Sequence, residues 1–499
     1  MLPTGRIRRP PARLLDDAVL TQRFDWEMRT LLRHYRWIEL TQTAEYARMG
    51  LLGHDAAERI HRVVLDLTPE QVGAERAAAM SDPLFALERC VQARVPEGAH
   101  AWHVDRSRND VQACAQLMLG RERLLETVAA VSGLASATLR AAAGHTESVM
   151  PGYTQHQTAQ TMTFGFYLAA LAEAATDATE SLLALFDTVN LCPLGAGAMA
   201  GLELPWDRER IAVALGFDRP QPHALTSVAS RAWVLRTAGE LSVLGTTLSR
   251  FLTDLIWWSG SSCRFVDLPD ELAGISSAMP HKRNFPILER ARGMTGHLVG
   301  LSYDIMIGQR NTGYTNLVEV SKESTRFLED LFSTCATMLA LFEQVVANVR
   351  FHPERAGRVA RGELTAASTV ANHLTLEHGV PARSAQVVVG SWISAAMERL
   401  DPAATLTPDL LSAPDLAAAG ERLGFPLAVE EAEVRGLLDA EASVWRKRTG
   451  GSTGPEQVRL LLEQTGDRLA AAERGAAERS GWLREAWEHT TGTKAGDLS

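Results

Sequence analysis

The sequence is poor in the residues that mark several specialised classes of protein. Its five cysteines are scattered and odd in number, and none stands in a C-x-x-C spacing, which argues against a disulfide framework or a zinc site. Reduced thiols of this kind favour a cytoplasmic location. No metal and no other cofactor is expected.

The sequence also lacks a net positive charge, and its long apolar runs are few. A formal net charge of −10 argues against a protein that coats nucleic acid, because phosphate binding requires a basic face. The basic N-terminus is not followed by the apolar run of a secretory signal. The most apolar stretch, Leu241 to Gly260, is interrupted by Arg250 and Asp254, which are costly within lipid, so no membrane span is expected.

The composition is that of a large helical protein. Hydrophobic residues make up 46% of the chain and charged residues 22%, with abundant Ala and Leu. About five long helices are predicted between Asp110 and Val349, and two of them, Val111 to Met150 and Val228 to Ser259, are rods of ~45 Å or more at 1.5 Å per residue. The stretch from Met162 to Phe186 is apolar on more than one face, which predicts burial in a long bundle that also packs against other subunits.

The chain length predicts about three domains. We expect an N-terminal helical domain over residues 1–105, a central long-helix bundle over residues 106–353, and a C-terminal helical domain over residues 354–499. The central domain contains a loop at residues 269–286. The predicted fold class is all-α.

The first candidate motif, HVDRSRND, stands just before the longest predicted helix. Arg106 and Arg108 are suited to pair with carboxylates, Ser107 and Asn109 to donate neutral hydrogen bonds, and the helix N-terminus favours negative charge. The alternative is a polar turn with Asn109 or Asp110 as the N-cap.

The second motif, PGYTQHQTAQ, is predicted to be a turn followed by polar residues that open an apolar helix. Thr154, Gln155 and His156 are candidates to face a ligand. The alternative is an ordinary helix start, because Thr and Gln near a cap commonly bind backbone groups.

The third motif, AGISSAMPHKRNFP, has too many small and polar residues for a core segment and is predicted to be a mobile surface loop. Ser276, Lys282 and Asn284 bring a hydroxyl, an ammonium and an amide group onto this one element. The alternative is a solvated basic loop.

The fourth motif, YTNLVEVSKE, begins at Tyr314 and places Glu319 and Lys322 on a probable helix. The alternative is an ordinary solvated helix face. The four motifs together, in this order, carry more weight than each one alone.

Taken together, these segments resemble the argininosuccinate lyase branch of the fumarase/aspartase superfamily. HVDRSRND is similar to H-T-G-R-S-R-N-D, PGYTQHQTAQ to P-G-Y-T-H-L-Q-x-A-Q, and PLGAGAMAG to P-L-G-S-G-A-x-A-G. The segment ISSAMPHKRNF resembles the superfamily signature G-S-S-x-M-P-x-K-x-N-P, and GVPARSAQVVVG resembles a segment of the third domain.

The resemblance implies a three-domain all-α subunit that assembles as a homotetramer around a 20-helix core, with active sites shared between subunits. It also implies roles for the candidate residues. Ser276 is the base, and Lys282 and Asn284 stabilise the intermediate. The substrate-binding residues are then Arg106, Ser107, Arg108, Asn109, Thr154, Gln155, Tyr314, Glu319 and Lys322.

Several residues differ from the branch where the leaving group would bind. Gln155 stands where the branch has the histidine linked to proton donation, and glutamine cannot titrate; His103, His223 and His281 are alternative donors. Glu319 replaces a usual Gln, and a carboxylate there favours a cationic amine. The other differing residues are Asn316, His223, Thr226, Ala232 and Phe285.

The leading hypothesis is therefore a carbon–nitrogen lyase that splits an N-substituted aspartate into fumarate and an amine, or adds an amine to fumarate. Its partners are a small-molecule substrate and further copies of the chain. One alternative is elimination of nitrite from nitrosuccinate, since a stable anionic leaving group needs no histidine. An intramolecular cycloisomerase and a non-catalytic structural relative are further alternatives.

Overall fold

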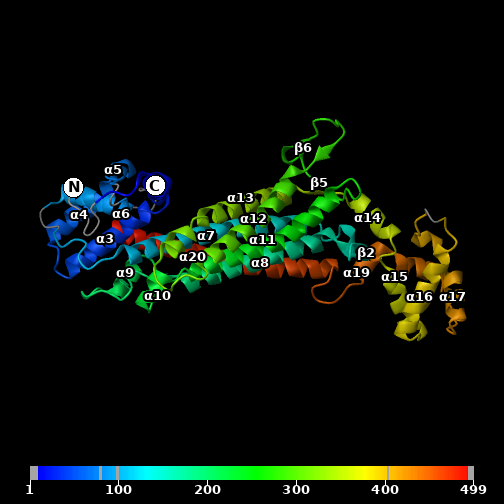
Figure 1. The fold of residues 1–499 in the computed structure, drawn as a ribbon. Coiled ribbons are helices and arrows are strands. Elements are labelled where there is room, and N and C mark those ends of the chain that lie inside the picture. Colours follow the sequence, from blue (N-terminus) through cyan, green and yellow to red (C-terminus); the bar gives the residue numbers. More distant parts are fainter. Residues whose placement is uncertain (1–8, 78–80, 97–99, 402–403, 493–499) are drawn as a thin grey trace.

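The computed structural model describes residues 9–77, 81–96, 100–401 and 404–492, so the basic residues at the start of the chain, 1–8, lie outside the described ranges. The molecule is elongated, and long helices run side by side along its middle (Figure 1). These are α7 (Arg108–Ala143), α8 (Phe164–Val189), α11 (Ala232–Ser259), α12 (Pro286–Gln309) and α13 (Leu328–Asn348). The predicted all-α class and the five long central helices are confirmed.

The central bundle is held together by one extended apolar core. Helix α7 packs against α8 and α13, and α12 packs against α11 and α13. The helices approach closely where α7 carries Gly120, because a Cβ there would stand 2.3 Å from the ring of Trp233. The core side chains are mostly Leu, Val, Ala and Phe, which fill the space between the rods without polar groups that need partners.

A sixth long helix, α20 (Pro455–Thr491), returns along the bundle and ties its two ends together. It packs on α7 and α8 and then reaches α3. Trp487 of α20 meets Trp37 of α3 edge to face, with ring centroids 5.1 Å apart. The end of the described chain therefore lies beside its beginning (Figure 1).

Each end of the bundle carries a cluster of shorter helices with its own apolar core. The first cluster contains α1 (Arg13–Leu15), η1 (Asp16–Leu20), α2 (Thr21–Thr30), α3 (Leu32–Arg48), α4 (His54–Asp66), α5 (Pro69–Ala74) and α6 (Pro83–Arg94). The second contains α14 (Pro353–Gly362), α15 (Ala367–His378), α16 (Ala382–Met397), η4 (Pro408–Leu410), α17 (Ala413–Arg422), α18 (Glu431–Leu438) and α19 (Ala440–Trp445). The predicted domain limits at 105 and 353 stay predictions.

The predicted ends of two helices were wrong where a β-hairpin separates them. The helix expected up to Met150 ends at Ala143, and the helix expected from Met162 begins at Phe164. Strands β1 (Val149–Thr154) and β2 (Gln157–Thr163) pair antiparallel between them. Pro151 and the β-branched threonines of this stretch disfavour helix, and the pairing satisfies the backbone instead.

The remaining elements are short connections. Strands β3 (Leu191–Cys192) and β4 (Arg219–Pro220) pair parallel, and β5 (Val266–Asp267) pairs antiparallel with β8 (Arg350–Phe351). The helical turns are α9 (Arg208–Ala214), α10 (Ala224–Ala229), η2 (Asp270–Leu272) and η3 (Glu319–Glu323). The rod predicted from Val228 is interrupted at Ser230 and Arg231, where α10 has ended and α11 has not begun.

Among the described residues, one stretch is long and apolar enough to cross a membrane by length and composition. It is Glu319–Asn348, not the apolar part of α11 considered in the sequence. Its helix α13 buries nine side chains against the bundle, as the core helix of a globular protein does. This stretch is therefore weak evidence for a membrane span.

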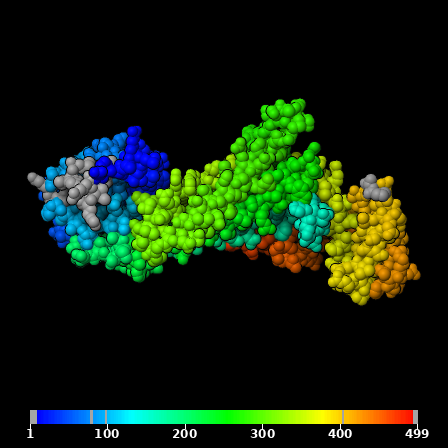
Figure 2. Space-filling model, in the orientation of Figure 1, coloured from blue at the N-terminus to red at the C-terminus, as the bar shows by residue number. Residues whose placement is uncertain are grey.

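The predicted loop stands out from the body of the molecule. Strands β6 (Gly274–Ile275) and β7 (Arg283–Asn284) form its stem, and the segment between them projects beyond the bundle (Figure 2). The segment between these strands is largely exposed, as the sequence predicts, while the bounds 269–286 stay a prediction.

Candidate functional site

The stem of the projecting loop carries Ser276 and Lys282 just beyond its last paired residues. Gly274 pairs with Asn284 and Ile275 with Arg283, so Ser276 directly follows one strand and Lys282 directly precedes the other. The stem closes tightly because residue 274 is a glycine, since a Cβ there would stand 2.9 Å from the ring of Pro286.

The hydroxyl oxygen of Ser276 sits over two backbone amides. It accepts hydrogen bonds from the N–H of Met279 at 3.1 Å and, more weakly, from the N–H of Ala278 at 3.4 Å. Donors directed at an oxygen stabilise its anionic form. Both contacts are local to the turn, and the same two donors would also face an oxygen that gained negative charge.

The loop is fixed at its stem and open at its tip. Arg283 binds the carboxylates of Asp267 and Asp270, so this arginine anchors the stem. Ile275, at the end of the stem, is 93% exposed, and Met279 in the tip is 42% exposed. Both apolar side chains are therefore in contact with solvent in the single subunit.

The HVDRSRND motif mainly ties the start of α7 to its neighbours. Arg106 is buried and forms two hydrogen bonds of 2.8 and 2.6 Å to the carboxylate of Glu39, which also faces His103. Burial alone would raise the pKa of Glu39, but Arg106 and His103 outweigh it and hold that pKa well below its usual value. The carboxylate expected opposite Arg106 is thus supplied by the chain itself.

Asp110 in the same motif holds the glycine-rich loop after β3. Its carboxylate accepts the backbone N–H of Gly195 at 3.0 Å and of Gly197 at 2.9 Å. Burial raises the pKa of Asp110 to about 6, although these hydrogen bonds and Arg106 act in the opposite direction. Asp110 is an anchor for the loop and does not cap the helix.

The N-cap of α7 is Ser107, which corrects the expected Asn109 or Asp110. The Ser107 hydroxyl accepts the backbone N–H of Asn109 at 3.1 Å. The Asn109 amide is exposed and donates to the carbonyl of Ala198 at 3.1 Å, which leaves its own oxygen to accept hydrogen bonds. Ser107 and Asn109 therefore face the surface at the positive end of a 36-residue helix.

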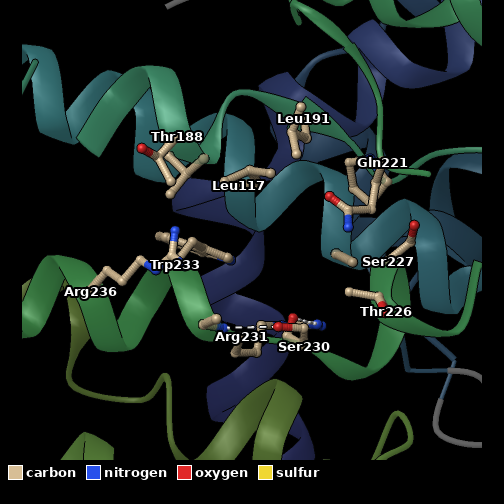
Figure 3. Close-up of a pocket in the computed structure, with 14 residues that line it drawn as sticks. Leu117, Thr188, Leu191, Gln221, Thr226, Ser227, Ser230, Arg231, Trp233 and Arg236 are labelled. Atoms are coloured by element: carbon tan, nitrogen blue, oxygen red, sulfur yellow. Dashed lines mark hydrogen bonds between the residues drawn. The ribbon is translucent and has the colours of Figure 1, made fainter. Parts of the chain in front are cut away.

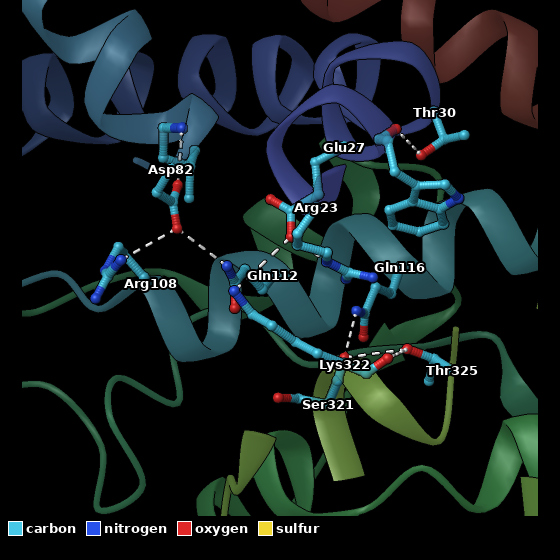
Figure 4. A network of polar contacts seen from close by, with 12 residues as sticks. Arg23, Glu27, Thr30, Asp82, Arg108, Gln112, Gln116, Ser321, Lys322 and Thr325 are labelled. Atoms are coloured by element: carbon cyan, nitrogen blue, oxygen red, sulfur yellow. Dashed lines mark hydrogen bonds and ion pairs between the residues drawn. The ribbon is translucent and has the colours of Figure 1, made fainter. Parts of the chain in front are cut away.

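The cations at this end of the bundle are paired with buried carboxylates (Figure 4). Lys322 lies 3.9 Å from the Glu27 carboxylate, and Arg108 donates to Asp82 at 3.1 Å. Burial and the charge of Glu27 raise the pKa of Asp82, which Arg108 partly offsets. The chain has only four lysines, and two of them are the candidate residues Lys282 and Lys322.

Glu27, Glu39 and Asp82 did not emerge from the sequence. Each is almost fully buried, whereas acidic side chains are normally exposed. Glu27 and Glu39 lie within helices and Asp82 is the N-cap of α6, and none of these local positions identifies a distant partner.

Tyr314 and Glu319 lie at the same end as Lys322. The Tyr314 ring is 63% exposed, and its hydroxyl stands 3.5 Å from the hydroxyl of Thr226. Glu319 is exposed at the first position of η3.

Thr226 also lines a cavity of about 260 Å³ between α7, α8, α10 and α11 (Figure 3). Arg231 and Arg236 are among its 14 lining residues, none of which is acidic. Two of the positions where the chain differs from the branch, Thr226 and Ala232, are in this lining.

Thr154 and Gln155 lie at the opposite end of the bundle, at the tip of the β1–β2 hairpin. Gln155 and His156 form the two-residue turn, with φ of 50° and 60°. Glycine or asparagine normally occupies such a turn, so the positive φ angles of Gln155 and His156 are unfavourable for these residue types. The His156 ring packs against Trp257 at 5.7 Å, while Gln155 is exposed. The expectation of a helix start here is wrong.

The candidate residues therefore fall into two groups at opposite ends of the subunit. Helix α12 has 24 residues, about 36 Å, and separates the serine loop from Tyr314 and Lys322. Helix α7 has 36 residues, about 54 Å, and separates Ser107 from the Thr154 hairpin. One subunit does not bring the four motifs to one point.

Comparison with known proteins identifies the family. Residues 61–300 match the family described as "Lyase". The chain is 30% identical over 434 residues to the argininosuccinate lyase of Methanothermobacter thermautotrophicus, covering 85% of this chain and 90% of that protein. It is also 30% identical over 432 residues to the argininosuccinate lyase of Cupriavidus metallidurans, with 85% and 89% covered.

Solved structures agree on the fold. An EDDS lyase variant with bound fumarate superposes with a TM-score of 0.82 at 24% identity, covering 98% of this chain and 96% of the other. A class II fumarase from Schistosoma mansoni superposes with a TM-score of 0.66 at 14% identity, with 88% and 96% covered. The chain therefore belongs to the argininosuccinate lyase branch of the fumarase/aspartase superfamily and is a carbon–nitrogen lyase.

Proposed function

We propose that this lyase eliminates an amine from an N-substituted aspartate to give fumarate, or runs the same reaction in reverse. The observation that carries the proposal is the Ser276 hydroxyl, which accepts two amide N–H groups on a projecting loop that also carries Lys282. A base, its stabilising donors and a cation are thereby held on one element.

In the proposed reaction, the Ser276 alkoxide removes a proton from the carbon next to a substrate carboxylate. The carboxylate then takes up the electron pair as a doubly charged aci-carboxylate, which Lys282 and Asn284 stabilise. When the C–N bond breaks, the electron pair of the aci-carboxylate forms the fumarate double bond, and the C–N pair leaves with the amine nitrogen. That nitrogen takes up one proton, which balances the proton that Ser276 removed. Closure of the loop would exclude water and strengthen each of these interactions.

We further propose that the active site is built from several subunits of a homotetramer. The serine loop supplies the base, the hairpin supplies Thr154 and Gln155, and the far end supplies Ser107, Asn109 and Lys322. An apolar face on α11 and α12 supports assembly, with exposed Val243, Val299, Tyr303, Met306 and Ile307. Gly293, Gly296 and Gly300 on α12 face open space, which lets a partner helix approach closely.

The leaving group we favour is an amino acid or a similar amine that carries a carboxylate. Glu319 offers a negative charge for a cationic amine at the Lys322 end of the bundle. The nearby cavity presents Arg231 and Arg236 without an acidic residue in its lining, and arginine binds carboxylates well. Its volume of about 260 Å³ suits a side group of modest size.

A second candidate is the elimination of nitrite from nitrosuccinate. Gln155 favours it, because an amide cannot donate a proton by titrating and nitrite leaves without one. Glu319 opposes it, since a carboxylate repels an anionic leaving group.

A substrate panel tests the proposal and separates the two candidates. The panel contains argininosuccinate, adenylosuccinate, aspartate, ethylenediamine-disuccinate and nitrosuccinate, with fumarate followed by its ultraviolet absorbance. We expect fumarate from an N-substituted aspartate and a lower rate from nitrosuccinate. A clear preference for nitrosuccinate would replace the amine with nitrite as the leaving group.

A further inference from the structure

A cluster of three metal-binding side chains lies in the C-terminal helices, outside the residues assigned to the lyase reaction. It consists of His373 and His378 on α15 and Glu433 on α18, and their ligand atoms all lie within 4.8 Å of one another. We propose that these three residues bind a divalent transition metal of the Zn²⁺ class and thereby join α15 to α18.

The donor set suits this metal. Two imidazoles and one carboxylate, with a water in the fourth position, are a known zinc arrangement, and the two histidines have an H-x₄-H spacing that falls within the range of zinc ligands. The cysteine spacings predict no metal, which is why none was expected from the sequence. No local pattern pairs these histidines with a glutamate 55 to 60 positions further along the chain.

The contact between His373 and Glu433 is not an ordinary hydrogen bond. The imidazole Nε2 lies 2.9 Å from the carboxylate Oε1, yet this buried nitrogen has no partner of acceptable hydrogen-bond geometry. Ligands of a tetrahedral Zn²⁺ stand about 3.3 Å apart at metal–ligand lengths of ~2.0–2.1 Å, so a small outward shift would admit the ion.

The helices hold the ligands in place. His378 is the last residue of α15, and Gly379 follows it in the left-handed conformation with φ of 66°. The His378 ring lies 5.4 Å from the His373 ring, measured between centroids, although residues five apart normally point to different sides of a helix. Beneath the cluster, Leu374 and Val434 belong to one apolar core, which fixes α15 beside α18.

Access and charge also fit an ion at this position. The Glu433 side chain is 38% exposed and the His373 side chain 16%, so the cluster opens to solvent on one side. Arg435, the arginine nearest in sequence to Glu433, is engaged by Glu431 and lies 3.9 Å from Asp409. The five cysteines are all buried and do not offer a competing thiol at the surface.

Calorimetric titration with ZnCl₂ of the full chain, first stripped with a chelator, tests the proposal. We expect one Zn²⁺ per chain, weakened by at least ~10-fold in His378→Ala and in the isosteric Glu433→Gln. His54→Ala is the matched control, because His54 faces Glu58 at 3.7 Å in an exposed pair and should leave the titration unchanged. Bound Zn²⁺ should also raise the melting temperature of the wild type but not of His378→Ala.

A titration in which wild type and both variants behave alike would overturn the proposal. The same conclusion follows if the wild type binds less than half an equivalent, or if His54→Ala loses the binding instead. Circular dichroism of each variant checks that the helices are retained, and Glu433→Gln keeps the test valid if His378→Ala unfolds. None of these readouts depends on lyase activity.

Discussion

The separation of the candidate residues makes a quantitative prediction about mixed assemblies. Ser276 and Lys322 lie beyond opposite ends of α12, which is about 36 Å long, so each active site should take them from different subunits. Two inactive variants, Ser276→Ala and Lys322→Met, should therefore restore activity when they are unfolded and refolded together.

The expected recovery follows from counting. In an equal mixture, half of the chains that donate the serine carry an intact Ser276, and half of the chains that donate the lysine carry an intact Lys322. Random assembly then makes one site in four intact, so fumarate formation should return to about 25% of the wild-type rate. If a single chain supplied both residues, no site would be intact and the rate would stay at zero.

A matched control uses two residues on the same loop. Ser276 and Asn284 lie on one hairpin, so Ser276→Ala mixed with Asn284→Ala should recover nothing. Size-exclusion chromatography would establish that each mixture reassembles. Reassembled mixtures of Ser276→Ala and Lys322→Met that remain inactive would refute a site shared between subunits.

Three further predictions concern single residues. Glu39→Gln leaves Arg106 buried without its counter-charge, so the free energy of unfolding, measured with urea, should fall by about 3–5 kcal/mol. The control variant Glu58→Gln should change it little, because the Glu58 side chain is 60% exposed. Equal losses in the two variants would contradict this prediction. Burial raises the pKa of Asp110 to about 6, so between about pH 4 and pH 6 the folded protein keeps a proton that the unfolded chain has lost. The contribution of Asp110 to stability therefore declines as the pH rises through this range. Asp110→Asn should remove that decline, whereas parallel curves for variant and wild type would count against it. Gln155→His should speed amine elimination by at least ~10-fold below the imidazole pKa of ~6.5 and leave nitrite release unchanged. The control variant Gln157→His should change neither rate. If Gln155→His has no effect, position 155 does not face the leaving group.

The long helices and the serine loop were predictable because their signals are local. Apolar residues at helical spacing define α8 and α11, and a run of small and polar residues between two prolines defines the loop around Ser276. The β1–β2 hairpin was missed, because a polar stretch such as PGYTQHQTAQ was interpreted as a helix start. Its turn uses Gln155 and His156 in a conformation that those residue types rarely adopt, and the sequence contains no sign of it.

The buried ion pairs were beyond local inference. Arg106 meets Glu39 from 67 positions away, and Arg108 meets Asp82 from 26 positions away, so only the packed helices reveal which cation is already neutralised. Sequence patterns identified the charged residues of the motif but not which of them remain available to a substrate. The same limit applied to His373, His378 and Glu433.

The central claim is that Ser276 is the base of a fumarate-forming elimination, and its most direct test compares Ser276→Ala with Ser277→Ala. Fumarate is measured for the substrate of the panel that wild type turns over fastest. We expect Ser276→Ala to lose at least ~1,000-fold in rate, while Ser277→Ala, one residue away on the same loop, retains most of it. A Ser276→Ala variant that forms fumarate as fast as wild type would show that Ser276 is not the base.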